Sequence, residues 1–242
     1  MGEENIHKNH RQRMRKKVEE YGLESLPAHE VLEYLLFFAI PRQNTNPIAH
    51  RLLSRFGGFC QVLEASPEEL AQVEGMGPAS ARFLHSLLQV SRYYQIEKRR
   101  QIRRLNTEEE AMEYVKPLFV GLKEEQIYAV ILDDKNGVLR CEQLGQGLAN
   151  SVEVSAGKLA KSVLLAGGTS VILAHNHPAG LPLPSPEDIV TTGKLVKALG
   201  VLGIDLVDHI VVAQGEATSM SKRQCMPIYD PLRGEVEYPR HR

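Results

Sequence analysis

The sequence predicts an α/β (α+β) protein, in which a helical N-terminal domain is followed by a mixed β-sheet flanked by helices. Three observations support this fold class. The chain of 242 residues is long enough for two domains with separate hydrophobic cores. Apolar residues recur at helical spacing between positions 28 and 94, and β-rich apolar runs alternate with helical patterns after Arg104. We therefore expect domains over residues 1–104 and 105–227, followed by a C-terminal tail over 228–242.

The N-terminal half shows both the spacing and the end signals of several helices. Apolar residues at positions 31, 32, 35 and 36, and again at 48, 52, 53 and 56, share one helical face. Gly57-Gly58 ends one helix. Ser66-Pro67-Glu68-Glu69 begins the next, with an N-cap serine, a proline at the first helical position and a capping-box glutamate.

The C-terminal half alternates between strand and helix patterns, which indicates a sheet covered on its faces by helices. Lys135-Asn136-Gly137 is a strong hairpin turn between two strands, and the run 169–174 is apolar enough to be a central strand. The expected strands are 128–132, 138–143, 169–174 and 204–212, and the expected helices are 107–115, 156–165 and 186–199.

The charge distribution differs between the two halves. Residues 1–105 carry 16 Lys and Arg against 12 Asp and Glu, a net charge of +4, whereas the remainder carries 13 against 18, a net charge of −5. The basic residues are concentrated in the runs 8–17 and 98–104. Such runs attract polyanions, and they also occur as solvated helix faces or linkers.

Cys60, Cys141 and Cys225 are widely spaced and form no CxxC pair, which argues against a disulfide framework and against a cysteine-rich zinc module. The N-terminal region has no apolar leader segment, and the apolar stretch 31–40 is interrupted by Glu33 and too short to span a membrane. We therefore expect a cytoplasmic protein with no membrane partner.

The segment from His175 to Asp188 carries the clearest chemical signal. His175 and His177 stand at i and i+2 at the end of the buried strand, so both imidazoles point to the same face. Pro178 ends the strand, and a proline-rich loop leads to a helix with Asp188 in its first turn. Two histidines and one aspartate form a three-ligand site with an open fourth position, which is typical of catalytic zinc.

Each part of this pattern also has a structural explanation. Ser185-Pro186-Glu187-Asp188 is a helix cap by itself, and Ser66-Pro67-Glu68-Glu69 has the same form with no histidine beside it. A pair of histidines can also simply end a strand. The combination of both features at adjacent strand and helix ends favours metal binding.

The spacing of HxH, seven residues, Ser, two residues and Asp resembles the signature of the JAMM/MPN metalloproteases. The form HisAsnHisPro resembles the RadC branch of that group, and the similarity extends over residues 105 to about 227. This resemblance implies a JAMM/MPN-type sheet and a Zn2+ ion held by His175, His177 and Asp188. It also implies that Ser185 stabilises the oxyanion.

The same resemblance implies a glutamate on an upstream strand that acts as general acid and base. Glu142 is the best match, because it lies on the expected hairpin strand shortly before Gly147 and Asn150, and Glu153 is the alternative. Activated water, a carboxylate base and an oxyanion donor together hydrolyse amide or isopeptide bonds, so a peptide or a protein conjugate is the expected substrate.

The chain departs from the RadC pattern at Ala179, at Ser155-Ala156-Gly157-Lys158, and at Leu181 and Leu183. None of these is an expected ligand, so the departures bear on substrate preference. Asp208-His209 also matches the family, and with the ligand set complete we interpret this pair as structural.

Other metal and nuclease motifs do not fit the spacing. His29-Glu30-Val31-Leu32-Glu33 is close to HExxH, but its fifth residue is glutamate and the segment is an apolar helix face. A zinc deaminase would need HxE followed by ProCysxxCys. HisAsnHis is also distinct from the dispersed HNH nuclease motif.

Residues 73–81 resemble a helix-hairpin-helix, a module that binds the DNA backbone without regard to sequence. Gly75 and Gly77 would allow close approach to a phosphate, and Ser80 stands near the amides that begin the next helix. Ser80 replaces the lysine usual in the family, and the module can also serve packing or protein contact. This GxG follows a helix rather than a strand, which argues against a dinucleotide fold.

The sequence thus predicts a zinc-dependent hydrolase associated with DNA repair or recombination. The alternative is a non-catalytic DNA-binding adaptor with a structural zinc site.

Overall fold

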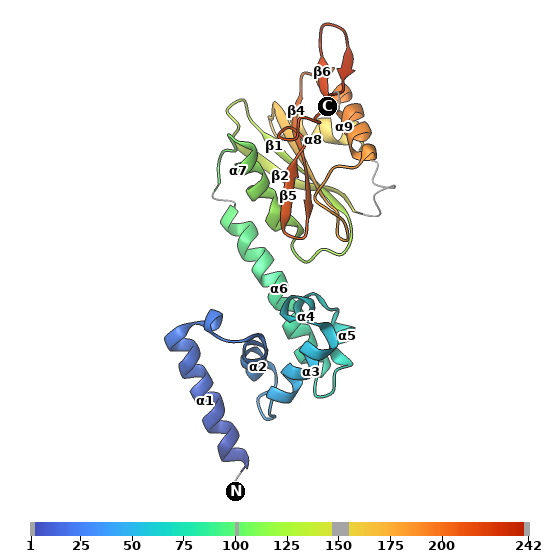
Figure 1. The fold of residues 1–242 in the computed structure, drawn as a ribbon. Coiled ribbons are helices and arrows are strands. Elements are labelled where there is room, and N and C mark those ends of the chain that lie inside the picture. Colours follow the sequence, from blue (N-terminus) through green and yellow to red (C-terminus); the bar gives the residue numbers. More distant parts are fainter. Residues whose placement is uncertain (1–2, 100–101, 147–154, 240–242) are drawn as a thin grey trace. The chain divides into compact units, whose positions relative to one another are not determined.

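The computed structural model describes residues 3–99, 102–146 and 155–239. The chain forms two compact units, Met1–Tyr93 and Tyr94–Arg242 (Figure 1). Each of the described helices is too short or too polar to cross a membrane.

The first unit is helical, as the sequence predicts. Its apolar core includes Leu32, Leu52, Val62 and Leu84, all fully buried. The elements are α1 (Glu3–Tyr21), η1 (Leu23–Ser25), α2 (Ala28–Ala39), α3 (Asn46–Phe56), α4 (Phe59–Glu64), α5 (Pro67–Ala71) and α6 (Pro78–Arg99), the last of which continues into the second unit.

Local caps in this unit follow the sequence signals. Gly57 ends α3 with a φ of 88°, a conformation that glycine adopts without steric cost. The predicted capping box is confirmed, because Glu69 N donates to Ser66 Oγ at 3.2 Å and Ser66 N donates to Glu69 Oε2 at 2.8 Å. Glu33, from the segment that is close to HExxH, is buried and contacts His10 Nε2 at 2.8 Å.

The second unit contains a five-stranded mixed sheet in the order β2-β1-β3-β4-β5. Strand β1 runs antiparallel to β2 and to β3, β3 runs parallel to β4, and β4 runs antiparallel to β5. The strands are β1 (Gln126–Leu132), β2 (Val138–Gln146), β3 (Ser170–Asn176), β4 (Asp205–Ala213) and β5 (Glu216–Ser219). The predicted hairpin turn before β2 is confirmed, with Asn136 at a φ of 59°.

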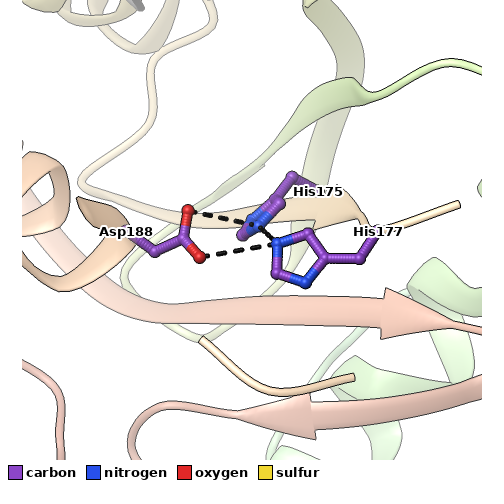
Figure 2. A group of neighbouring side chains, drawn as sticks. All are labelled: His175, His177 and Asp188. Carbon is purple, nitrogen blue, oxygen red and sulfur yellow. Dashed lines mark hydrogen bonds and ion pairs between the residues drawn. The ribbon is translucent and has the colours of Figure 1, made fainter. Parts of the chain in front are cut away.

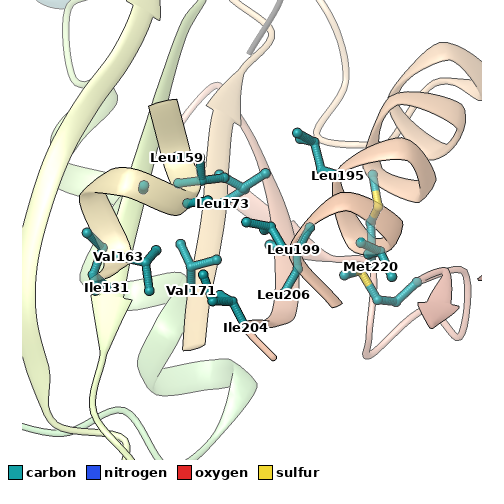
Figure 3. Close-up of a cluster of buried hydrophobic side chains, with 14 residues drawn as sticks. Ile131, Leu159, Val163, Val171, Leu173, Leu195, Leu199, Ile204, Leu206 and Met220 are labelled. Atoms are coloured by element: carbon teal, nitrogen blue, oxygen red, sulfur yellow. The ribbon is translucent and has the colours of Figure 1, made fainter. Parts of the chain in front are cut away.

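Helices cover both faces of this sheet (Figure 1). One face packs Ile131, Leu173 and their neighbours against Leu159 and Leu199 of two helices (Figure 3). The other face packs Ile172 and Ile210 against a third helix. The covering elements are α8 (Ala156–Leu165) and α9 (Pro186–Gly200) on the first face, and α7 (Glu108–Val115) with η2 (Lys116–Phe119) on the second.

The segment for which the sequence predicts only a tail contains a hairpin of β6 (Ile228–Asp230) and β7 (Glu235–Glu237). Its tyrosines lie against glycines of α9: a Cβ on Gly200 would meet the Tyr229 ring, and one on Gly193 would meet the Tyr238 hydroxyl. The packing of these tyrosine rings on glycine backbone holds the segment against α9. Strands of three residues are too short for their alternation to predict them from the sequence.

Candidate metal centre

The end of β3 positions both histidines. His175 is 8% exposed and lies opposite Ile127 of β1 and Val211 of β4. His177 follows the strand, and its backbone N–H donates to Val212 O at 2.8 Å. Because side chains two residues apart in extended chain share a face, both rings project to the side of the sheet that bears Leu173. The two rings lie together, with their centroids 4.7 Å apart.

Asn176, between the two histidines, fixes the strand end from the opposite side. Its Oδ1 accepts from Gln126 N at 2.8 Å, and its Nδ2 donates to Glu124 O at 3.1 Å. The side chain thus holds the segment before β1 against the end of β3. Sequence reasoning passed over this role, because an asparagine that fixes a neighbouring backbone is recognised only once the strand pairing is known.

Asp188 is held in place by a capping box at the start of α9. Ser185 N donates to Asp188 Oδ2 at 2.7 Å, and Asp188 N donates to Ser185 Oγ at 3.1 Å. The Ser185 hydroxyl also donates to Asp188 Oδ2, at 2.8 Å. These bonds leave the carboxylate little rotational freedom, so the cap that begins the helix also aims the side chain.

The structure brings His175, His177 and Asp188 together (Figure 2). Asp188 Oδ1 lies 3.4 Å from His175 Nε2, and Asp188 Oδ2 lies 3.5 Å from His177 Nε2. The two Nε2 atoms are 2.9 Å apart. The three side chains offer ligand atoms that all lie within 4.8 Å of one another.

This arrangement fits a bound zinc ion. A carbonyl only accepts, so the 3.1 Å contact of His177 Nδ1 with Leu181 O requires a proton on Nδ1, and the neutral ring presents a bare Nε2 to the cluster. Two imidazole nitrogens and a carboxylate that converge in this way need a proton or a cation between them. Tetrahedral zinc with bonds of about 2.0–2.1 Å separates its ligand atoms by roughly 3.3 Å, close to the observed nitrogen–oxygen distances.

The charges of the cluster stabilise one another. The Asp188 carboxylate raises the pKa of His177. Burial alone would raise the pKa of Asp188, but hydrogen bonds with His175 and His177 outweigh burial and hold that pKa well below its usual range. The site therefore keeps its carboxylate ionised and attracts positive charge.

Glu142 is on β2, as predicted, and its Oε1 accepts a short hydrogen bond from Ser162 Oγ of α8. Its Oε2 lies 3.6 Å from Arg140. The residue pairs with Ala129, whereas His175 lies level with Ile127. The alternative, Glu153, lies outside the described residues, as do Gly147 and Asn150.

Among the described carboxylates, Glu125 has a pKa that responds to the charges of the cluster. Burial raises its pKa, and the nearby His177 and His175 partly oppose that rise. Glu125 directly precedes β1, and extending the pairing of Ile127 with His175 by two residues brings it level with His177. Sequence reasoning missed Glu125, because its only signal is a position before a strand whose antiparallel partner could not be identified from the sequence.

His209, expected to be structural, contacts a candidate ligand. His209 Nε2 lies 2.9 Å from His175 Nδ1, and His209 Nδ1 lies 2.6 Å from Thr192 Oγ1. Burial, followed by the neighbouring His175, lowers the pKa of His209 to about 3, so its ring is neutral. Asp208 points elsewhere and accepts hydrogen bonds from Ser219 Oγ and from backbone N–H groups.

In the first unit, the residues predicted to contact DNA have mainly local roles. Gly75 has a φ of 91°, and a Cβ on it would lie 2.8 Å from the Ile48 side chain. Ser80 is 3% exposed, and its hydroxyl bonds both the N–H and the carbonyl of Gly77 at 3.0 Å. A Cβ on Gly77 would meet nothing within 4 Å, so its Cα faces open space.

Comparisons with known proteins match both parts of the chain. A family model for the RadC-like JAB domain matches residues 105–225, and a UPF0758 N-terminal model matches residues 7–82. A UPF0758 protein of Carboxydothermus hydrogenoformans is 35% identical over 209 residues, covering 86% of this chain and 92% of the relative. The corresponding protein of Ruegeria pomeroyi is 35% identical over 217 residues, covering 89% of this chain and 96% of the relative. Because the RadC-like JAB match covers half of the chain and these relatives span most of it, the protein belongs to the UPF0758 family and contains its RadC-like JAB domain.

Proposed function

We propose that this protein is a zinc-dependent hydrolase of the JAMM/MPN type that cleaves amide or isopeptide bonds. The observation that carries the proposal is the convergence of two imidazole Nε2 atoms and one carboxylate at the end of β3. Three ligands from a strand end and a helix start leave a fourth position open for substrate or water, as catalytic zinc sites do. Membership of a JAB-domain family supports the same chemistry.

In this proposal His175, His177 and Asp188 hold the zinc ion. When bound, zinc acts as a Lewis acid that polarises a carbonyl group and lowers the pKa of water to about 7. The capping box keeps Asp188 oriented before any ion binds. The role of Ser185 in stabilising the oxyanion stays a prediction. Its hydroxyl donates to Asp188 Oδ2 in this structure and would have to turn toward a substrate to serve that role.

We assign the acid and base role to Glu125 rather than to Glu142. A general base works best when its pKa approaches the working pH, and burial raises the pKa of Glu125 in that direction. Its place level with His177, and its charge interaction with that ring, support a carboxylate that accepts a proton from water and returns it to the leaving amine. Glu142 is engaged with Ser162 of α8 and with Arg140.

The test combines metal analysis with turnover on a library of peptide and isopeptide substrates. Purified wild-type protein should contain close to one zinc per chain, and His177→Ala should lose it, since one of three ligands is removed. Cleavage of any amide substrate that requires both zinc and Glu125 supports the hydrolase. Stoichiometric zinc without cleavage of any substrate would favour the adaptor with a structural zinc site.

We also propose that the first unit contacts DNA phosphates, which fits a role in DNA repair or recombination. Arg13 and Arg15 are exposed on α1, and Gly77 offers an open approach at the start of α6. The repair context itself rests only on the resemblance of residues 73–81 to a helix-hairpin-helix. Because phosphate binding releases counterions, the full-length protein should bind unrelated DNA sequences equally, with affinity falling as salt rises.

A matched pair of variants tests the DNA proposal. Arg13→Gln with Arg15→Gln should weaken binding, whereas Lys194→Gln with Lys197→Gln removes two exposed charges from α9 and should leave binding unchanged. Equal binding by both double variants would remove α1 from the contact surface. Gly75 is unsuitable for this test, because a side chain there would disturb Ile48.

A further inference from the structure

A chain of buried hydrogen bonds connects two of the candidate ligands behind the metal centre. It begins at the backbone carbonyl of Asp188, which lies 2.6 Å from Thr192 Oγ1. It continues from Thr192 Oγ1 to His209 Nδ1 at 2.6 Å, and from His209 Nε2 to His175 Nδ1 at 2.9 Å. Thr192 is fully buried and His209 is 3% exposed, so solvent does not replace these partners.

The direction of each hydrogen bond follows from the number of protons available. A carbonyl only accepts, so the single hydroxyl proton of Thr192 is donated to Asp188 O. Thr192 Oγ1 must then accept from His209 Nδ1–H. A second proton on His209 would create a buried imidazolium against the His175 ring, which is costly, so its Nε2 is an acceptor.

The last bond decides the state of His175. Because His209 Nε2 accepts, His175 Nδ1 carries the proton that is donated, and a neutral His175 has a bare Nε2. That Nε2 is the atom 3.4 Å from Asp188 Oδ1 and 2.9 Å from His177 Nε2. The opposite tautomer would direct a proton into the centre and exclude a cation.

We propose that Thr192 and His209 are positioning residues that hold His175 in the Nδ1–H tautomer and so direct its Nε2 lone pair toward the metal. This inference rests on the proposed zinc site and extends it beyond the three ligands. Partners that hydrogen-bond to metal-bound histidines fix both tautomer and ring orientation, and their loss typically lowers metal affinity by 10–100-fold.

These hydrogen bonds also connect β3, β4 and α9, so the metal is not the sole link between the strand end and the helix start. His175 stands on β3, His209 on β4, and Thr192 and Asp188 on consecutive turns of α9. The strand end and the helix start are therefore tied together in the metal-free protein. This preorganisation reduces the ordering that zinc binding must impose.

Thr192→Val tests the proposal, because it keeps the side-chain shape and removes the hydroxyl. His209 Nδ1–H then loses its acceptor, and the ring should turn to the Nε2–H tautomer and reverse the bond to His175. Zinc affinity, measured by competition with a chelator, should fall 10–100-fold. Thr192→Ser restores the hydroxyl and should restore the affinity, and Thr191→Val, exposed on the same helix, should bind zinc like the wild type.

Imidazole ¹⁵N chemical shifts provide a readout that does not depend on zinc or on turnover. In metal-free wild-type protein the His209 signal, assigned by its disappearance in His209→Gln, should report the Nδ1–H tautomer, and in Thr192→Val it should move toward Nε2–H. Equal affinity losses in Thr192→Val and Thr192→Ser, or an unchanged His209 tautomer in Thr192→Val, would overturn the proposal. If wild-type protein binds no zinc, the proposed function fails, while the tautomer measurement still decides the role of Thr192 and His209.

Discussion

Zinc should stabilise the second unit against unfolding in a manner that depends on Asp188. A ligand that binds only the folded state adds about 2.7 kcal/mol of stability when its concentration is one hundred times Kd. For a unit of about 150 residues, each kcal/mol corresponds to roughly 2–4 °C in Tm. Wild-type protein should therefore melt roughly 5–11 °C higher with zinc at that concentration than with a chelator.

Asp188→Asn is the informative perturbation. The amide oxygen can still accept from Ser185 N, so the helix cap is largely retained. The negative charge that faces His175 and His177 at 3.4 and 3.5 Å is removed. If zinc affinity falls one hundredfold, the same zinc concentration equals the new Kd, and the stabilisation drops to about 0.4 kcal/mol.

Glu69→Gln is the matched control, because Glu69 occupies the equivalent position of the other capping box. Glu69→Gln should cost little, near the low end of the roughly 0.5–2 kcal/mol attributed to caps. Asp188→Asn also removes the carboxylate that His175 and His177 stabilise in the metal-free protein, so the rise in Tm with zinc is taken for each variant against its own melt with chelator. Calorimetric melts with zinc and with chelator, together with zinc content, measure the difference. Asp188→Asn protein that keeps one zinc per chain and the full rise in Tm would refute the assignment of Asp188 as a ligand.

Three further predictions follow from the same site and from the first unit. Glu125→Gln should keep zinc and lower turnover by roughly 10²–10⁴-fold, whereas Glu142→Gln should stay near wild-type activity; the reverse order would return the base to Glu142. The raised pKa of His177 should stabilise metal-free protein below its unfolded pKa of about 6.5 and cease to do so as pH rises through the folded value, and the lowered pKa of Asp188 should stabilise above its unfolded pKa of about 3.9. Urea titrations should thus show both contributions to the free energy of unfolding between about pH 4 and 6.5. The His177 contribution should decline at higher pH, and it should be absent in His177→Ala. The slope of log affinity for DNA against log salt should become less negative by about 0.7–0.9 for each phosphate that the Arg13 and Arg15 double variant no longer neutralises, and an unchanged slope would contradict a role for these arginines in DNA binding.

Much of the fold could be predicted because its signals are local. The helix ends that Ser66, Gly57 and the proline at position 186 predict occur where expected. The central strand, whose apolar run is also a local signal, is buried along its whole length. Strand β5, by contrast, has only four residues, and its sequence GluAlaThrSer has no apolar alternation. It forms because β4 offers an antiparallel edge, which is a tertiary cause with no local signal.

The candidate ligands could also be predicted locally, since strand period and helix capping place His175, His177 and Asp188 without knowledge of the whole sheet. The supporting residues could not. His209 contacts His175 from β4, and Glu125 precedes β1, so their positions depend on which strands flank β3 and in what register. Glu142 matches the sequence expectation by its place on a strand before the motif, and whether it or Glu125 acts as the base is decided by the turnover of the two variants.

The two capping boxes show how a structural device becomes a binding site. Ser66 with Glu69 and Ser185 with Asp188 make the same reciprocal bonds, and both follow the same Ser-Pro-Glu pattern. The cap fixes the carboxylate in either case, so orientation alone does not confer metal binding. What differs is the opposite side: two imidazoles at the end of β3 face Asp188, and Thr192, one turn further along α9, connects through His209 to one of them. A histidine pair introduced opposite Glu69 would have no counterpart of Thr192 and His209 to fix the tautomer of its rings. We therefore expect such a pair to bind zinc more weakly than the native centre.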